Sequence, residues 1–306
     1  MATSGPPSLA VLDLAVAGQA AAEVARAAED HLLARRAEPP AMRTACAEAL
    51  AAAGGPEAAN TTAGACALAI AAAVERHGAA FPPGAEPAYH DRHHQAEATL
   101  VMGWLTGHAR RQGLIGAEEA RLAVAAMAGH DLLHDGSAGA ARGALERISA
   151  EASARIAEEA GLPPPEVAAL RRIILATTWP WEEADAPDLL CRMAREADLF
   201  GSAMPRLGPV LARRLARELA EAGQPDAAAV ASHAARVSLL RLLPPPTAAA
   251  RAFGMEAVRE AQLAAYSAVA RRLGLRPASA EAGAGALDAM DEADALALLA
   301  HAGHAP

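Results

Sequence analysis

The sequence predicts an all-α protein, a compact bundle of many helices, on three grounds. About 30% of the 306 residues are alanine, which loses no side-chain entropy in a helix and has the highest helix propensity. Aromatic residues are only 3% of the chain, and we find no segment that alternates apolar and polar residues as a half-buried strand does. Prolines and glycines divide the chain into pieces of helix length. A large sheet is therefore not expected.

Prolines and glycines also set the expected helix boundaries. The segment FPPGAEP at 81–87 forms a rigid linker between the first helices and the later ones. We expect residues 1–8 to be disordered. The tail from about 276 is rich in Ala, Gly and Asp, and we expect it to hold one last helix near 288–301. The other expected helices cover roughly residues 10–36, 41–53, 57–77, 92–112, 117–134, 142–160, 165–177, 186–202, 207–222, 226–243 and 247–273.

The length fits one globular domain with a substantial core. We expect three parts within it: an N-terminal helical cap at 1–80, a central core at 81–205, and a C-terminal helical flank with a low-complexity tail at 206–306. Alanine-rich helices each bury little area, so association into a homodimer would help them to bury more.

Charge and residue usage exclude several classes of function. The chain has no lysine, so all 27 basic residues are arginine, and chemistry that needs a phosphate-binding or Schiff-base lysine is ruled out. A net charge of −9 argues against a general nucleic-acid-binding surface. The longest uncharged apolar run, about residues 61–74, is too short and too rich in alanine to cross a bilayer.

The cysteines and the N-terminus predict a cytoplasmic protein with no membrane partner. Cys46, Cys66 and Cys191 are scattered and odd in number, which suits a reducing compartment and no disulfide framework. The first residues, MATSGPP, lack the basic region of a secretory signal.

Histidines concentrate in one part of the chain, because seven of the eleven lie between positions 77 and 134. The two dense segments are YHDRHH at 89–94 and GHDLLHDG at 129–136. Each holds two histidines four positions apart, which would share one face of a helix. Two such helices can present four imidazoles and a carboxylate to one point, a donor set that suits Zn, Mn, Fe, Co or Ni. The histidine pairs are His90 with His94 and His130 with His134, and the carboxylate is Asp131.

The histidine segments resemble the HD-domain metal-dependent phosphohydrolase superfamily, and in particular its class I 3',5'-cyclic-nucleotide phosphodiesterase branch. The segment at 89–94 is similar to the branch's opening motif, Tyr-His-Asn-x-x-His, with Asp91 in place of the Asn. The segment from His130 is similar to its second motif, His-Asp-x-x-His-x-Gly. Three shorter blocks follow in the same order, and together the five cover about residues 86–202. The short blocks are Leu145–Arg147, Ile174–Thr177 and Ala197–Leu199.

The resemblance implies a two-metal centre in the part at 81–205, which would be an HD-type catalytic core. A tightly held Zn, Mn or Fe ion would occupy the first site, and a second ion, Mg or Mn, would be completed mainly by water. Asp131 would bridge the two ions. The implied ligands of the first ion are His94, His130, Asp131 and Asp198.

The resemblance also implies roles for residues around the metals. His90 would be the general acid for the leaving group. Glu146, His134 and Thr177 would orient metal-bound water and support the second site. The branch holds a purine with a late Gln beside an aromatic clamp, and Gln262 has a matching place in the sequence, although a solvated helical glutamine is the simpler interpretation.

The expected function is metal-dependent hydrolysis of a small-molecule phosphoester, above all a phosphodiester such as a cyclic nucleotide. A bridging hydroxide would attack phosphorus and His90 would protonate the leaving alkoxide. Two alternatives stay open. An HD-fold di-iron oxygenase would need more histidine ligands, with His93 as an extra one, and a non-catalytic regulatory module would keep the metal site without turnover. A colourless protein would argue against the first, and phosphodiester turnover against the second.

Overall fold

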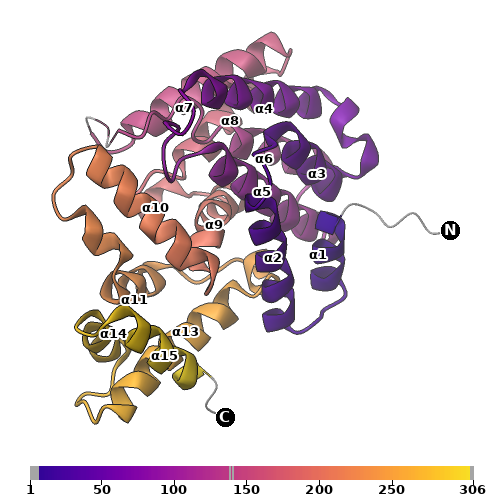
Figure 1. Cartoon of the computed structure of the whole chain (residues 1–306). Helices are drawn as coiled ribbons and strands as arrows, with labels where there is room; N and C mark the ends of the chain where they lie inside the picture. Colours follow the sequence, from indigo (N-terminus) through magenta and orange to yellow (C-terminus); the bar gives the residue numbers. More distant parts are fainter. Residues whose placement is uncertain (1–6, 138, 140, 304–306) are drawn as a thin grey trace.

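The computed structural model describes residues 7–137, 139 and 141–303. The chain is 73% helical, and the described residues form no strand, which confirms the all-α prediction. The helices pack into one body whose N-terminal part is drawn in indigo and whose C-terminal part is drawn in yellow (Figure 1). No described helix is both long and apolar enough to cross a membrane. The expected disorder of residues 1–8 falls outside the described residues for 1–6, and α1 already begins at Pro7.

Fifteen α-helices and three short 3₁₀ segments are found among the described residues. The α-helices are α1 (Pro7–Val16), α2 (Ala21–Arg36), α3 (Met42–Gly54), α4 (Thr62–Ala80), α5 (Arg92–Arg111), α6 (Ala117–Ala128), α7 (Ala144–Glu159), α8 (Pro164–Leu175), α9 (Leu189–Ala203), α10 (Leu207–Glu221), α11 (His233–Leu242), α12 (Ala248–Ala252), α13 (Met255–Arg272), α14 (Ala280–Asp288) and α15 (Glu292–Gly303). The 3₁₀ segments are η1 (Pro56–Asn60), η2 (Glu183–Asp185) and η3 (Ala227–Ala231).

Four of the expected helices are interrupted, and one of them, the segment 57–77, divides into η1 and α4 at Thr61. The segment 10–36 forms two helices, α1 and α2. The segment 247–273 divides at Gly254, whose φ of 78° is left-handed backbone that favours glycine and ends α12. The segment 226–243 is helical only from His233, after η3. The tail after 276 holds α14 as well as α15, so the expectation of a single last helix is wrong.

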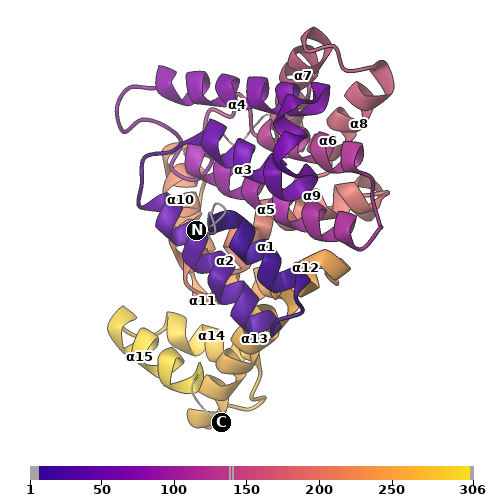
Figure 2. The same ribbon diagram turned by 90° about the vertical axis from the view of Figure 1, so that its right-hand side faces the viewer.

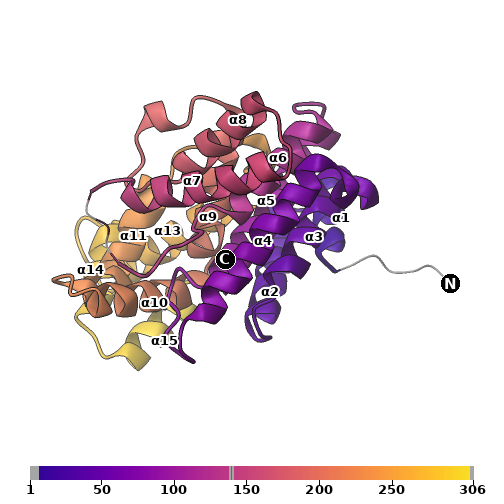
Figure 3. The same cartoon turned by 90° about the horizontal axis from the view of Figure 1, so that it is seen from above.

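Helix α5 lies in the middle of the bundle, in contact with α3, α6 and α9 (Figure 3). Two glycines on α5 allow α3 to approach closely. A Cβ at Gly103 would lie 2.5 Å from Cα of Ala49, and one at Gly107 would lie 2.4 Å from the carbonyl oxygen of Ala52. The approach places the Trp104 side chain fully inside the core. Helices α1–α4 thus share one apolar core with α5–α9.

Two buried carboxylates tie later helices to this bundle. Glu29 of α2 accepts hydrogen bonds from the backbone N–H groups of Arg206 and Leu207 at 2.7 and 2.8 Å, and so satisfies the N-terminus of α10. Glu196 of α9 accepts from the backbone N–H and the hydroxyl of Thr247 at 2.5 and 2.6 Å, at the start of α12. The N-terminal helices therefore help to position α10.

The C-terminal helices have a small core of their own below the main bundle (Figure 2). It forms where α11, α13, α14 and α15 meet, and its largest buried side chains are Val237, Tyr266, Val269 and Leu287. This core lies within the expected flank at 206–306. The expected part boundaries at 80 and 205 stay a prediction.

The close approach of α3 and α5 predicts the effect of adding one methyl group. Gly103→Ala should lower the free energy of unfolding by about 1–3 kcal/mol, because backbone atoms of α3 occupy the space that the Cβ needs. The matched control is Gly285→Ala on α14, where a Cβ meets no atom within 4 Å. There alanine should stabilise the protein by up to about 1 kcal/mol. Urea denaturation followed by circular dichroism measures the free energy of unfolding of both variants. If the two substitutions changed this free energy in the same direction, the packing described would be contradicted.

Candidate metal centre and pocket

The first histidine segment lies at the start of α5. Asp91 is the N-cap residue, and its Oδ1 accepts a hydrogen bond from the backbone N–H of His94 at 2.8 Å. Its Oδ2 binds the guanidinium of Arg214 on α10 at 3.0 Å. His90 precedes the helix, so the expectation that His90 and His94 share a helical face is wrong. Their rings are instead perpendicular, with centroids 5.8 Å apart.

The second histidine segment lies beyond α6, which ends at Ala128. The expected helix through position 134 is therefore too long, and His130 and His134 do not share a helical face. The residues after Gly129 form turns that α7 holds in place. Ser153 and Ser149 of α7 donate hydrogen bonds to the carbonyl groups of Gly129 and Leu132, at 3.2 and 2.7 Å.

The first cluster brings together two imidazoles and two carboxylates: His94, His130, Asp131 and Asp198. His94 Nε2 lies 3.1 Å from Asp198 Oδ1 and 3.4 Å from Asp131 Oδ2. His130 Nε2 lies 3.0 Å from Asp131 Oδ2 and 3.6 Å from Asp198 Oδ1. The two Nε2 atoms are 3.4 Å apart. All four residues expected to bind the first metal thus meet at one point, from α5, the turn after α6, and α9.

The donor atoms of this cluster are oriented as in a metal site. His130 uses Nδ1 to bind the carbonyl oxygen of Met127 at 2.8 Å, which leaves Nε2 directed into the cluster. Asp131 Oδ2 is buried and has no well-aligned hydrogen bond among the described residues. Such an unsatisfied buried oxygen is costly unless a cation or proton meets it. His94, His130 and Asp198 could therefore hold a metal ion, with Asp131 beside them.

The electrostatics of the cluster also fit a cation. Burial would lower the pKa of His94, but the carboxylates of Asp131 and Asp198 outweigh it and raise the pKa to about 9. The same carboxylates raise the pKa of His130, against the effect of burial. Burial opposes ionisation of Asp131 and Asp198, yet the imidazoles lower the pKa of both carboxyl groups. The two buried carboxylates are therefore stable as anions only with positive charge beside them, which either protons on the imidazoles or a metal ion can supply.

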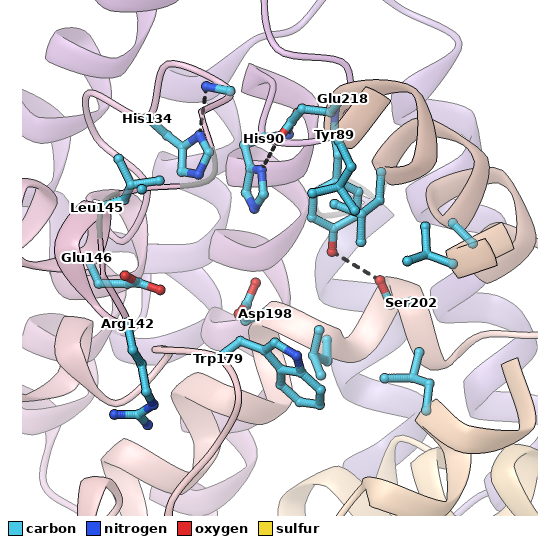
Figure 4. Close-up of a pocket in the computed structure, with 18 of the residues that line it drawn as sticks. Tyr89, His90, His134, Arg142, Leu145, Glu146, Trp179, Asp198, Ser202 and Glu218 are labelled. Atoms are coloured by element: carbon cyan, nitrogen blue, oxygen red, sulfur yellow. Dashed lines mark hydrogen bonds and ion pairs between the residues drawn. The ribbon is translucent and has the colours of Figure 1, made fainter. Parts of the chain in front are cut away.

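A second cluster joins His90 and His134 to Glu218, a residue of α10 that the sequence motifs did not indicate. The two rings are stacked, with centroids 3.9 Å apart and planes 19° apart (Figure 4). Glu218 Oε1 forms a short hydrogen bond with His90 Nδ1, and its Oε2 accepts from the backbone N–H groups of Tyr89 and His90 at 2.7 and 3.0 Å. These three residues could also hold a metal ion.

His134 is poised to be a neutral imidazole. Burial, followed by the charge of His90, lowers the pKa of His134 to about 4. Its Nδ1 accepts a hydrogen bond from the backbone N–H of Gly136 at 3.1 Å, which fixes the ring orientation. The pKa of Glu218 is lowered by its bonds to His90 and the backbone, although burial opposes this. Glu218 is thus an anion bound to His90, whose ring stacks on His134.

Three other expected site residues differ in where the structure places them. Glu146 lines the pocket, and burial and repulsion from Asp131 and Asp198 raise the pKa of its carboxyl group. Thr177 donates its hydroxyl to the carbonyl oxygen of Ile174 at 2.8 Å and is not part of the pocket lining.

Gln262 is not brought to the pocket either. Its side-chain nitrogen donates to the carbonyl groups of Ala203 and Val258 at 2.9 and 3.0 Å, and its oxygen accepts from Arg236 at 2.6 Å. The amide therefore holds α13 against the end of α9. The sequence position alone could not reveal this use of the side chain.

A cavity of about 520 Å³ opens beside the two clusters. His90, His134 and Asp198 lie on one side of it, with Glu146 and Arg142 along another edge (Figure 4). Trp179, which is 45% exposed, stands at its rim. A small molecule in the cavity can thus contact His90, His134 and Glu218 of the second cluster and Asp198 of the first.

Comparisons with protein-family models, with curated proteins and with solved structures gave no match for this chain.

The charge balance of the first cluster predicts that metal binding releases protons. The pKa of about 9 for His94 means that its metal-free imidazole carries a proton at pH 7.5, which a bound cation must displace, and the pKa of His130 is shifted in the same direction by the same carboxylates. The affinity for Zn²⁺ or Mn²⁺ should therefore fall as the pH is lowered, by up to about tenfold per displaced proton for each pH unit.

Titration calorimetry in two buffers of different ionisation enthalpy counts the released protons. His301→Ala on α15, far from the cluster, should leave this count unchanged. His94→Ala should lower both the count and the affinity. Binding without proton release, or binding that His94→Ala does not weaken, would contradict the assignment.

Proposed function

We propose that this protein is a metal-dependent phosphoester hydrolase of the HD-domain type, similar to the class I phosphodiesterase branch. The observation that carries the proposal is the convergence of His94, His130, Asp131 and Asp198 at one buried point beside a cavity. A purely structural ion-pair cluster would have no need of the adjoining cavity.

The four donors of the first cluster would hold the tighter ion, which we propose to be Zn, Mn or Fe. His134, which is neutral at physiological pH, and Asp131 would support a second ion, Mg or Mn. Bound divalent ions supply such a site with a nucleophile at neutral pH and with neutralisation of phosphoryl charge. The raised pKa of the Glu146 carboxyl group suits a side chain that exchanges protons at the pocket edge.

His90 is the proposed general acid, and Glu218 is the residue that positions it. The Glu218 carboxylate holds the Nδ1 side of the ring, so the opposite nitrogen, Nε2, is left to donate a proton to a leaving alkoxide. Two backbone N–H bonds fix the same carboxylate, and stacking on His134 limits rotation of the His90 ring. The proton donor is thus held in place before substrate binds.

Glu218 also supports the di-iron oxygenase as a second candidate function. With this residue the two clusters hold four imidazoles and three carboxylates, one donor more than the sequence motifs supply. If His90, His134 and Glu218 bound an ion of their own, His90 would be a ligand rather than an acid. Iron content and an iron-dependent absorption band would favour this second function over hydrolysis.

The test of the proposal is a phosphoester panel. Purified protein, supplied separately with Zn²⁺, Mn²⁺ and Mg²⁺, should hydrolyse at least one class of phosphodiester or phosphomonoester, with product identified by mass. Asp131→Ala should lose both turnover and bound metal. Absence of turnover on the whole panel, in protein that retains its metal, would favour a regulatory module.

The proposed role of His90 predicts a dependence on the leaving group. His90→Ala should slow hydrolysis of an alkyl phosphodiester by about 10²–10⁴-fold, because the alkoxide needs a proton to leave. It should slow hydrolysis of a nitrophenyl ester much less, because nitrophenolate leaves without one. Bound metal should not change, and steady-state rates with elemental analysis measure both quantities.

The matched variant is His94→Ala, which should lose activity on both substrates together with the metal. Equal loss on both substrates in His90→Ala, with metal retained, would remove the general-acid role. Loss of metal in His90→Ala would identify His90 as a ligand.

A further inference from the structure

The wall of the cavity away from the first cluster is apolar. It is formed by side chains of α9, α10 and α11 and by η3. Several of these side chains are only half-buried, and Leu242 at the open end is 65% exposed. The apolar residues that matter here are Leu199, Leu215, Leu219, Val230, Leu239 and Leu242.

Two of the polar groups in this part of the cavity, Arg236 and Ser202, are already bound within the protein, and the exposed Ser238 of α11 is the other polar side chain on this wall. The Arg236 guanidinium donates to the carbonyl groups of Ser202, Ala203 and Met204 and to the Gln262 side chain, so its donors are used. Ser202 shares a hydrogen bond of 3.1 Å with the hydroxyl of Tyr89.

At the edge near Glu146, Arg142 is engaged by the protein through Nε and Nη2. Arg142 binds the carbonyl oxygen of Pro180 at 2.8 Å and forms an ion pair with Asp185. Among the described residues, the cavity lining contains no asparagine, glutamine or threonine. A nucleobase placed here would leave its polar edge without side-chain amide partners, which is costly in a buried site.

The apolar wall adjoins the residue proposed to donate the proton. Leu215 and Leu219 flank Glu218 on α10, at three positions before it and one after it, and both line the cavity. A leaving group that receives its proton from His90 therefore lies against these leucines. The part of the substrate that meets the apolar wall is the departing alcohol.

We propose that the substrate is a phosphoester of an aliphatic alcohol, with its alkyl chain along the wall formed by α10 and α11. This inference rests on the proposed phosphoester hydrolysis. Water attacks phosphorus and loses one proton, and the P–O bond to the departing alkoxide breaks. The alkoxide takes the proton of His90 and leaves as the alcohol, methyl phosphate or another phosphate product keeps the new P–OH group, and the proton lost by water restores His90. An alkyl chain would cover the half-exposed leucines. This contact lowers the free energy of binding, because burial of apolar surface is favourable in proportion to its area.

The experiment uses methyl n-alkyl phosphates with chains from two to twelve carbons, and 3',5'-cyclic AMP as the nucleotide comparison. kcat/KM should rise by roughly threefold to fourfold for each added methylene until the cavity is filled. The products should be the long-chain alcohol and methyl phosphate. Methanol as the main product, or a higher kcat/KM for the cyclic nucleotide than for the longest esters, would overturn the inference.

Binding of n-alkyl phosphonates, which are not hydrolysed, separates this inference from the proposed function. Their Kd, from calorimetry, should fall with chain length as kcat/KM rises. A chain-length gradient in Kd without turnover of any ester would overturn the proposed hydrolysis and leave the apolar wall only as a binding surface for alkyl chains. Turnover with a flat dependence on chain length would overturn the alkyl-chain inference alone.

Two wall variants test the position of the chain. Leu239→Gln should flatten the gradient, because an amide would face the alkyl chain. With Leu242→Gln, kcat/KM should stop rising at a shorter alkyl chain. Because Leu242 is exposed, this substitution should leave the folded structure intact. Leu296→Gln on α15, 55% exposed and outside the cavity lining, is the matched control and should leave the gradient intact. A gradient unchanged in both wall variants would overturn the inference.

Discussion

The arrangement of this protein depends on one electrostatic constraint, the need to balance two buried carboxylates. Asp131 and Asp198 face the same two imidazoles within 3.6 Å, in a region where unpaired charge is costly. Meeting the constraint requires α9 to lie against the start of α5 and the turn after α6. The carbonyl group of Met127 and the serines of α7 complete the support by fixing His130 and its turn. Much of the central packing serves this alignment.

The four histidines lie at or just outside helix ends rather than in pairs on helix faces, whereas Asp198 and Glu218 lie within α9 and α10. Asp91 closes the first turn of α5, so that His94 enters the helix while His90 stays outside it. Because α6 stops at Ala128, the following residues can turn sharply and direct His130 and His134 toward different clusters. A continuous helix would have placed each histidine pair on one face. The helix ends therefore separate His94 and His130, the proposed ligands, from the stacked pair His90 and His134 beside Glu218.

The sequence predicted the residues of the first cluster better than their geometry. The all-α class followed from alanine content, the histidine spacing indicated the two metal-binding segments, and the resemblance to the HD-domain superfamily implied the four members of that cluster. Helix ends were missed because alanine-rich sequence continues to favour helix where tertiary contacts stop it. Glu218 was missed because it lies in α10, more than a hundred positions from His90, with no motif around it. For Gln262 the sequence showed only that a glutamine occupies the position. The hydrogen bond between its side chain and Arg236 could not be predicted from the sequence.

Helix α11 links the cavity to the C-terminal helices. Its Arg236 binds three carbonyl groups at the end of α9, and the neighbouring Val237 belongs to the small C-terminal core. Burial lowers the pKa of Arg236 to about 10, so the guanidinium keeps its charge at neutral pH and those bonds persist. The apolar wall thus rests on a different set of helices from the one that holds His94 and His130. Changes in α11 can reshape the space for the alcohol while the carboxylates and imidazoles keep their alignment.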